Sequence, residues 1–265
     1  MTEMKDDLLN WASLQSSNLG FNTIVSLQPL REQASLRNYF RIETDKGTKI
    51  GVISEPRSKQ NKLFKTHSNF LLENGISVPA VEAYDYEKGL MILEDFGDKV
   101  LQLEINSENR ESFYKNAIKE IQKIQLCNTS TNLSILSRDK LEEQMQLFDE
   151  WFLRGFLNLV FSDGEQKLVV DSWKIISAEC SHQDYVLCHF DFELRNLMLK
   201  EDGDIGILDF QDLCIGPYAL DLVSIMKDIV NPLSKIEFGE YLEFYLNELQ
   251  CSYGEVKLSM ESLER

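Results

Sequence analysis

The chain has 265 residues, which is long enough for one large domain or for two lobes that share a cleft. Its 44 acidic and 27 basic side chains give a formal net charge of −17, which argues against DNA, RNA or an anionic membrane as a partner. The five cysteines show neither C-x-x-C pairing nor a zinc-ligand spacing, and no segment has the apolar length of a signal peptide or a membrane span. We therefore expect a cytoplasmic protein.

Strand signals dominate the first third of the chain. Alternating segments begin at residues 23, 38 and 48, and the composition of residues 44–47, TDKG, predicts a hairpin turn between the last two. Apolar residues at helical spacing predict a helix over 59–74, with Gly75 at its C-terminal cap. The segments VEAYDY and GLMILED predict a second hairpin. Residues 1–95 should thus form a small antiparallel sheet with one packed helix.

Helical periodicity replaces the strand signals after residue 95. One apolar stripe predicts a first long helix, and a second stripe predicts another that opens with Asp139 and Glu142 as a capping pair. The first stripe consists of Phe113, Ala117, Ile121 and Ile124, and the second of Leu141, Met145, Phe148 and Phe152. Trp151 and Phe152 could stack on a sugar ring, but their spacing with Phe148 favours a core role. Residues 96–265 should form a mainly helical lobe.

A hairpin inside this second region carries candidate metal ligands. The segments NLMLK and IGILDF flank EDGD, and Asp202-Gly203 is a strong turn signal. A two-residue turn there places Asn196 opposite Asp209, with Cβ atoms about 4.5 to 5.5 Å apart. An amide oxygen and a carboxylate on one face suit Mg²⁺, which takes few protein ligands and completes its shell with water and phosphate oxygens. The alternative is a solvated polar mouth of the hairpin.

Asp191 lies five residues before Asn196, in the loop that enters the hairpin. A carboxylate beside a metal-phosphate centre can accept a hydroxyl proton, so Asp191 is the candidate catalytic base. His189 is expected to order this loop by hydrogen bonding rather than to act in catalysis. For Asp212, turn capping is favoured over contact with a second cation.

These segments resemble a known family of kinases. HFDFELRN resembles the H-x-D-x-x-x-x-N catalytic loop of protein-kinase-like phosphotransferases, and ILDFQDLCIGPYALDL resembles the metal-binding segment of the aminoglycoside phosphotransferase and choline kinase group. The blocks QASLRNYFRIET, NGISVPAVEAYD, LEDFGD and EWFLRGFL follow in family order. Together they most resemble the bacterial anomeric kinases that act on N-acetylmuramate and N-acetylglucosamine.

The resemblance implies an α+β, two-lobed protein-kinase-like fold. A small antiparallel β-rich N-terminal lobe over residues 1–95 would bind the nucleotide, and a larger, mainly helical C-terminal lobe over 96–265 would carry the catalytic hairpin. ATP and Mg²⁺ are the implied cofactors, with Asp191 as base and Asn196 and Asp209 as metal ligands. The adenine would meet a hinge segment, residues 93–96, which makes Glu94 and Phe96 cofactor-binding candidates. Asp221 would accept hydrogen bonds from the backbone of the catalytic loop.

Two features depart from the family pattern. Ser54 stands about where many of these kinases have a phosphate-binding lysine, and the loop REQASLRNYF contains no glycine. The side chain of Arg37 and the backbone N–H groups around Ser35 are then the candidate phosphate contacts. The chain ends at Arg265, short of the length expected for the anomeric-kinase subgroup, so a truncated chain is one interpretation.

The sequence thus predicts an ATP-dependent small-molecule kinase. Its acceptor would be the anomeric hydroxyl of N-acetylmuramate or N-acetylglucosamine, in cell-wall sugar recycling. One alternative is a kinase of another acceptor: an aminoglycoside, choline, or another sugar or amino alcohol. Another is a catalytically weak nucleotide-binding module, suggested by the missing lysine. The partners are a small-molecule sugar and ATP, and the oligomeric state is left open.

Overall fold

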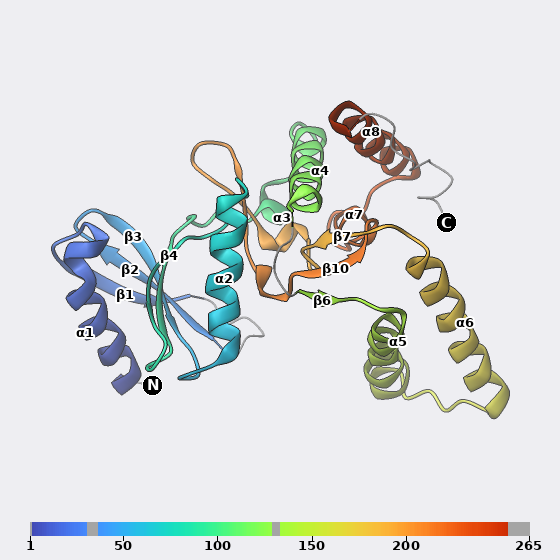
Figure 1. Ribbon diagram of the computed structural model, residues 1–265, viewed down its shortest axis with the longest axis horizontal. Helices are drawn as coiled ribbons and strands as arrows, with labels where there is room; N and C mark the ends of the chain where they lie inside the picture. Colours follow the sequence, from blue (N-terminus) through green and yellow to red (C-terminus); the bar gives the residue numbers. More distant parts are fainter. Residues whose placement is uncertain (1, 31–36, 129–132, 254–265) are drawn as a thin grey trace. The chain divides into compact units, whose positions relative to one another are not determined.

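The computed structural model describes residues 2–30, 37–128 and 133–253 (Figure 1). The chain divides into two compact units, and each contains a segment from a distant part of the sequence. The first unit comprises Met1–Ser107 and Leu194–Gln211, and the second comprises Glu108–Glu193 and Asp212–Arg265. The predicted catalytic hairpin therefore belongs to the first unit, together with the N-terminal sheet.

A five-stranded antiparallel sheet forms the centre of the first unit, in the order β1-β2-β3-β5-β4. The strands are β1 (Ile24–Pro29), β2 (Asn38–Thr44), β3 (Gly47–Ile53), β4 (Val81–Asp85) and β5 (Leu90–Glu94). Both predicted hairpins are confirmed. In the β2–β3 hairpin, Thr44 pairs with Gly47 across a two-residue turn, as the TDKG segment predicts.

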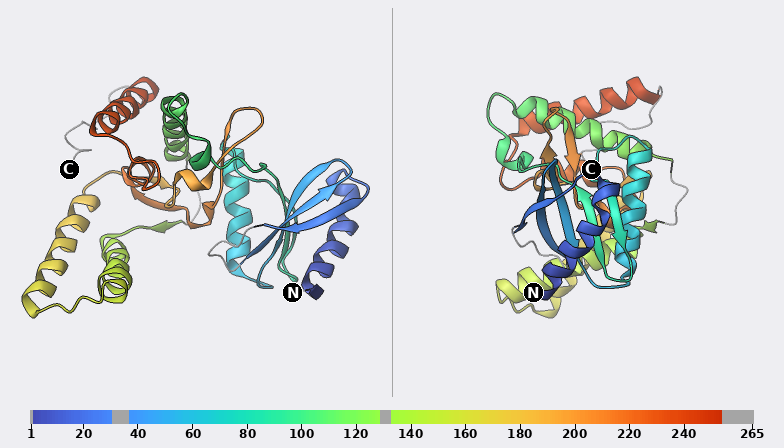
Figure 2. Two further views of the ribbon diagram at one scale, coloured as in Figure 1. Left: turned by 180° about the vertical axis from the view of Figure 1, so that it is seen from behind. Right: turned by 90° about the vertical axis from the view of Figure 1, so that its left-hand side faces the viewer.

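Two helices lie on opposite sides of this sheet (Figures 1 and 2). The predicted helix is α2 (Lys59–Glu73), and Gly75 follows it with a positive φ of +77°. The sequence reading missed α1 (Thr2–Leu19), although Leu8, Trp11 and Ala12 recur at its three- and four-residue spacing. These three side chains pack into a core with five residues of the sheet: Phe40, Ile42, Ile53, Leu90 and Ile92.

The catalytic hairpin has a register one residue away from the predicted one. Strand β8 (Leu197–Leu199) pairs with β9 (Ile205–Ile207), with Leu197 opposite Ile207. The turn contains three residues, because Gly203 adopts a φ of +88° and Asp202 accepts the backbone N–H of Asp204 at 3.0 Å. Asn196 consequently pairs through its carbonyl oxygen with the N–H of Leu208, at 2.8 Å. The predicted direct opposition of Asn196 and Asp209 is wrong.

The remaining elements of the first unit are short. They are the helix α3 (Leu101–Glu104) and two 3₁₀ turns, η2 (Leu194–Asn196) and η3 (Phe210–Asp212), whose last residue is assigned to the second unit. Helix α3 packs against β8 and η2. These contacts hold the start of the catalytic hairpin in place.

The second unit is mainly helical around a small three-stranded sheet, in the order β6-β10-β7. Its strands are β6 (Ser134–Ile135), β7 (Tyr185–Cys188) and β10 (Cys214–Pro217), and helices α4 (Arg110–Leu126), α7 (Leu220–Met226) and α8 (Lys235–Tyr253) pack together beside them. Three of the four predicted α4 stripe residues, Ala117, Ile121 and Ile124, are buried. Sheet and helices together confirm the predicted α+β class.

A helical pair completes the second unit: α5 (Arg138–Leu147), which continues into the π-helix η1 (Phe148–Phe156), and α6 (Asp163–Ser181). Ser137, rather than the predicted Asp139, caps α5, because its hydroxyl accepts the N–H of Lys140. Within the described part of the chain Trp151 and Phe152 are 70% and 43% exposed, and Phe152 stacks only on Phe148 and Phe156 of the same helix, so their predicted core role is wrong. None of the described helices has the length and apolar character that crossing a membrane requires.

Candidate active site

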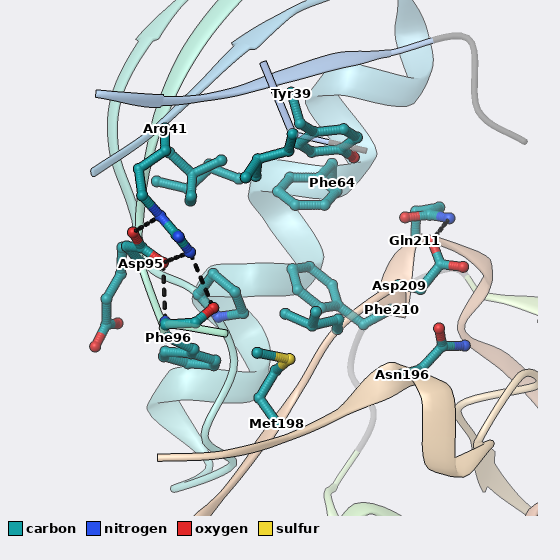
Figure 3. Close-up of a pocket in the computed structure, with 17 residues that line it drawn as sticks. Tyr39, Arg41, Phe64, Asp95, Phe96, Asn196, Met198, Asp209, Phe210 and Gln211 are labelled. Carbon is teal, nitrogen blue, oxygen red and sulfur yellow. Dashed lines mark hydrogen bonds and ion pairs between the residues drawn. The ribbon is translucent and has the colours of Figure 1, made fainter. Parts of the chain in front are cut away.

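A pocket lies wholly within the first unit, on the α2 side of the five-stranded sheet (Figure 3). Arg41, Ile50 and Leu93 line it from three adjacent strands, since Arg41 pairs with Ile50 and Ile50 pairs with Leu93. Directly paired residues share a face of the sheet, so this row forms one wall of the pocket. The other lining residues are Leu30, Tyr39, Phe64, Pro79, Glu94–Gly97, Asn196, Met198 and Leu208–Gln211.

Four predicted site residues line this one pocket. Glu94 and Phe96 come from the hinge segment, and Asn196 and Asp209 come from the catalytic hairpin. Phe96 packs on β9, where a Cβ atom at Gly206 would lie only 2.4 Å from its ring. The hinge and the hairpin therefore meet at Phe96, and only a glycine at position 206 leaves room for the ring.

Asn196, Asp209 and Gln211 lie at one end of the pocket, and Arg41, Asp95 and Phe96 lie at the other (Figure 3). Asp209 joins this group although the hairpin register is shifted, because strand β9 ends before it and its φ is +62°. A left-handed conformation is costly for a residue with a side chain, so it persists only where the surrounding structure holds it.

The donor atoms at this end suit Mg²⁺. Asn196 offers an amide oxygen and Asp209 a carboxylate, and a small number of oxygen ligands is typical of magnesium sites that also bind phosphate. Over the described ranges, no three or more His, Cys, Asp and Glu side chains cluster to form a metal centre from those protein ligands alone. The residues thus fit a cation held by two protein ligands, water and phosphate oxygens.

Gln211 connects Asp209 with the predicted phosphate contact Arg37. The side-chain amide nitrogen of Gln211 donates to the Asp209 carboxylate, and its oxygen lies 3.4 Å from Nη1 of Arg37. The Arg37 guanidinium also lies over the ring of Phe64, 5.0 Å from its centroid, and Phe64 packs on Phe210. The positively charged side chain of Arg37 is therefore linked through Gln211 to Asp209, the candidate metal ligand. Ser35, the other predicted phosphate contact, lies outside the described residues.

Ser54, which stands where the resemblance predicts a phosphate-binding lysine, has a structural role. It is 8% exposed, and its hydroxyl donates to the carbonyl of Gly89 at 2.7 Å and accepts from the amide of Asn61 at 2.7 Å. Asn61 in turn offers its oxygen to Nε of Arg37 at 3.4 Å. Ser54 is thus linked through Asn61 to Arg37, the candidate phosphate contact.

Asp191, the candidate base, lies in the second unit, in a loop held by a buried carboxylate. Asp221 is fully buried and accepts the backbone N–H groups of His189 at 2.7 Å and Phe190 at 2.9 Å, which confirms its predicted role. Burial raises the pKa of Asp221 to about 7, although these two hydrogen bonds lower it. The His189 ring is buried and makes a T-shaped contact with the ring of Phe192.

Two polar residues of the pocket, Arg41 and Gln211, were not among the candidates that the sequence indicated. Arg41 carries the clearer signal, because it alternates with the apolar Phe40 and Ile42 and therefore points to the opposite face of β2. Gln211 follows Asp209 by two residues, but its bond to the carboxylate depends on the 3₁₀ turn η3. No pattern in the sequence indicates that bond.

Comparisons with known proteins agree with this architecture. The model of the phosphotransferase enzyme family matches residues 26–255. The N-acetylmuramate/N-acetylglucosamine kinase of Pseudomonas putida is 27% identical over 241 residues, which cover 91% of this chain and 70% of the relative. The enzyme of the same name from Neisseria meningitidis is 28% identical over 228 residues, covering 84% of this chain and 65% of the relative.

Solved structures share the fold at low sequence identity. The ADP-bound aminoglycoside phosphotransferase APH(2'')-Ib has a TM-score of 0.65 at 15% identity, and the match covers 96% of this chain and 93% of that one. A choline kinase from Streptococcus pneumoniae has a TM-score of 0.66 at 14% identity, covering 97% and 84%. The predicted protein-kinase-like fold is confirmed. The chain belongs to the phosphotransferase enzyme family.

Proposed function

We propose that this protein is an ATP-dependent kinase that phosphorylates the anomeric hydroxyl of N-acetylmuramate or N-acetylglucosamine. The observation that carries the proposal is that residues of the hinge segment line the same pocket as Asn196 and Asp209. The acceptor is supported by relatives from Pseudomonas putida and Neisseria meningitidis, both named N-acetylmuramate/N-acetylglucosamine kinases. The same proposal includes a nucleotide-binding lobe over residues 1–95 and a catalytic lobe over 96–265, in which residues 96–107 and the hairpin at 194–211 contribute to catalysis although they pack within the first compact unit. It also includes a cytoplasmic location, where ATP is available.

The pocket supplies a binding role for each part of the nucleotide. The hinge segment, with Glu94 and Phe96, would meet the adenine, while Arg37 and the backbone near Ser35 would meet the phosphates. Asn196 and Asp209 would hold Mg²⁺, which when bound supplies positive charge to the phosphate oxygens. Arg37 would take over the charge neutralisation that a lysine provides elsewhere, since Ser54 is engaged in structural hydrogen bonds.

Asp191 would orient the acceptor hydroxyl and take its proton. The acceptor oxygen forms a bond to the γ-phosphorus while the bond from that phosphorus to the β-γ bridging oxygen breaks, and ADP leaves. The product is a sugar 1-phosphate, a suitable precursor for nucleotide-sugar synthesis in cell-wall recycling. Asp221 supports this step by fixing the backbone just before Asp191.

The decisive experiment measures ADP release with ATP and Mg²⁺ over four acceptors: N-acetylglucosamine, N-acetylmuramate, choline and an aminoglycoside. We expect turnover with the amino sugars only, and a loss of about 10²- to 10⁴-fold in kcat for Asp191→Ala, which is the usual cost of removing a general base. Phosphorus NMR of the product then assigns the phosphate to the anomeric oxygen. Asp163→Ala, a change of an exposed carboxylate in the first turn of α6, serves as the control.

Other outcomes separate the alternatives. Turnover with choline or the aminoglycoside would keep the kinase and replace its acceptor. A protein that binds ADP but turns over no acceptor, and whose ADP affinity Asp191→Ala leaves unchanged, would instead be a nucleotide-binding module. The missing lysine at Ser54 is the observation that keeps this second candidate in view.

A further inference from the structure

Arg41 makes the densest set of polar contacts of any pocket residue whose hydrogen bonds the structure describes. Its Nε donates to Oδ2 of Asp95 at 2.7 Å, and its Nη2 donates to Oδ1 of Asp95 at 3.1 Å and to the carbonyl of Gly97 at 3.0 Å. Its Nη1 donates to the exposed Asp98 at 2.6 Å. Arg41 thus binds the hinge segment and the turn that follows it at four points.

Of the two carboxylates that pair with Arg41, the buried Asp95 is the important one. The Asp95 side chain is 3% exposed, whereas that of Asp98 is 79% exposed, so solvent screens the second ion pair far more than the first. Asp95 also accepts the N–H of Gly97 at 2.9 Å, which closes the turn after the hinge segment. One carboxylate therefore both shapes this turn and receives a two-point contact from Arg41.

Arg41 reaches the hinge segment across a neighbouring strand. Strand β3 separates β2 from β5, and Arg41, Ile50 and Leu93 stand in one row across the three strands. At about 4.8 Å between strands, the Arg41 side chain has to extend over Ile50 to reach the end of β5. It therefore lies along the pocket wall, as Figure 3 shows, with its guanidinium at the hinge end.

We propose that Arg41 is a positioning residue for the nucleotide base, because it holds the hinge segment at a fixed place relative to the wall formed by β2 and β3. The inference rests on the proposed nucleotide site in this pocket. A hinge segment that is already fixed presents its backbone groups to the base without an ordering cost. The contact between Arg41 and Asp95 should therefore raise the affinity for the nucleotide and the discrimination between bases. Arginine suits the task because its planar fork matches a carboxylate at two points.

The test combines a double-mutant cycle with a matched control pair. The variants are Arg41→Met, Asp95→Asn and the double variant, in the full chain, with dissociation constants for ADP and GDP measured by calorimetry. The control pair, Lys49→Met and Glu82→Gln, removes an ion pair of 2.7 Å from the same sheet, between side chains that are 25% and 24% exposed. Thermal unfolding of every variant reports whether the fold is retained.

We expect Arg41→Met to weaken ADP binding by about 10- to 100-fold, the range for losing charged hydrogen bonds, and to bring the ADP and GDP constants closer together. If Arg41 acts through Asp95, the double variant binds ADP no more weakly than the worse single variant. The control pair should leave both constants unchanged. Arg41→Lys, which keeps the charge but loses the two-point contact, should bind ADP with intermediate affinity, and it decides the matter if Arg41→Met does not fold.

A folded Arg41→Met or Arg41→Lys protein that binds ADP as the unaltered protein does would overturn the role of Arg41. So would strictly additive effects of the two changes, or an equal loss in the Lys49 and Glu82 controls. An unaltered protein that binds no ADP would instead overturn the proposed nucleotide site, and this role with it.

Discussion

The carboxylate of Asp221 accepts the backbone N–H of Phe190 at 2.9 Å, and Phe190 adopts a φ of +81°. Such a conformation is strained for a phenylalanine and needs support from its surroundings. The fully buried Asp221 provides that support from α7, and the next residue in the chain is Asp191. A buried acid therefore fixes the backbone from which the candidate base projects.

The buried state of Asp221 predicts a pH dependence of stability. Its pKa is about 7 in the folded chain against 3.8 for an ordinary aspartate, chiefly because of burial. The folded protein thus binds the proton more tightly, so the stabilising contribution is complete below pH 3.8 and is lost as the pH rises through 7. The free energy of unfolding should fall by up to about 1.4 kcal/mol per pH unit in this window, and Asp221→Asn should remove that slope. Urea titrations at several pH values measure it, and parallel curves for the two proteins would contradict it.

Gly206 should tolerate no side chain. Because a Cβ atom there would lie 2.4 Å from the Phe96 ring, Gly206→Ala must displace the ring or the hairpin, at a cost of about 1 to 3 kcal/mol in unfolding free energy. ADP affinity should fall as well, since Phe96 belongs to the hinge segment. The control is Gly239→Ala in α8, where nothing lies within 4 Å of the added Cβ and alanine should stabilise the helix by up to about 1 kcal/mol. Equal effects of the two changes would refute the prediction.

Arg37 should contribute to binding of the nucleotide phosphates and not to binding of the base. We expect Arg37→Ala to weaken ADP binding by about tenfold or more, as loss of a charged hydrogen bond does, and to leave adenosine binding unchanged. Calorimetry with both ligands measures the ratio of the two dissociation constants. Arg57→Ala, which removes an exposed ion pair with Glu87, is the control. A parallel loss for ADP and adenosine would show that Arg37 only supports the pocket.

Asp209 and Asn196 should determine metal binding in the presence of nucleotide. Asp209→Asn removes the negative charge at the proposed site, so Mn²⁺, used as a spectroscopic stand-in for Mg²⁺, should bind at least about tenfold more weakly with ADP present. Asn196→Ala should act in the same direction. Electron paramagnetic resonance measures free Mn²⁺ directly, without turnover. Asp202→Asn, in the turn of the same hairpin, is the matched control, and an equal loss there would argue against the site.

Local elements of the fold could be predicted from the amino-acid sequence. Turn composition at residues 44–47 and the cap at Gly75 identify their elements because each depends on neighbours along the chain. Family motifs added the roles of more distant residues, and the hydrogen bonds of Asp221 bear one of them out. Spacing alone brought Asn196 and Asp209 together as candidates, although the predicted register was one residue off.

The assembly of the pocket, in contrast, depends on long-range packing that the sequence does not reveal. The turn at Gly203 and the positive φ of Asp209 set the end of the hairpin, and neither follows from periodicity, because both depend on backbone states that the surrounding packing stabilises. The contact between Arg41 and Asp95 joins strands that are not neighbours, so no local pattern contains it. The exposure of Trp151 could not be predicted from the sequence either. A helical stripe shows which residues share a face, but not whether another element covers that face.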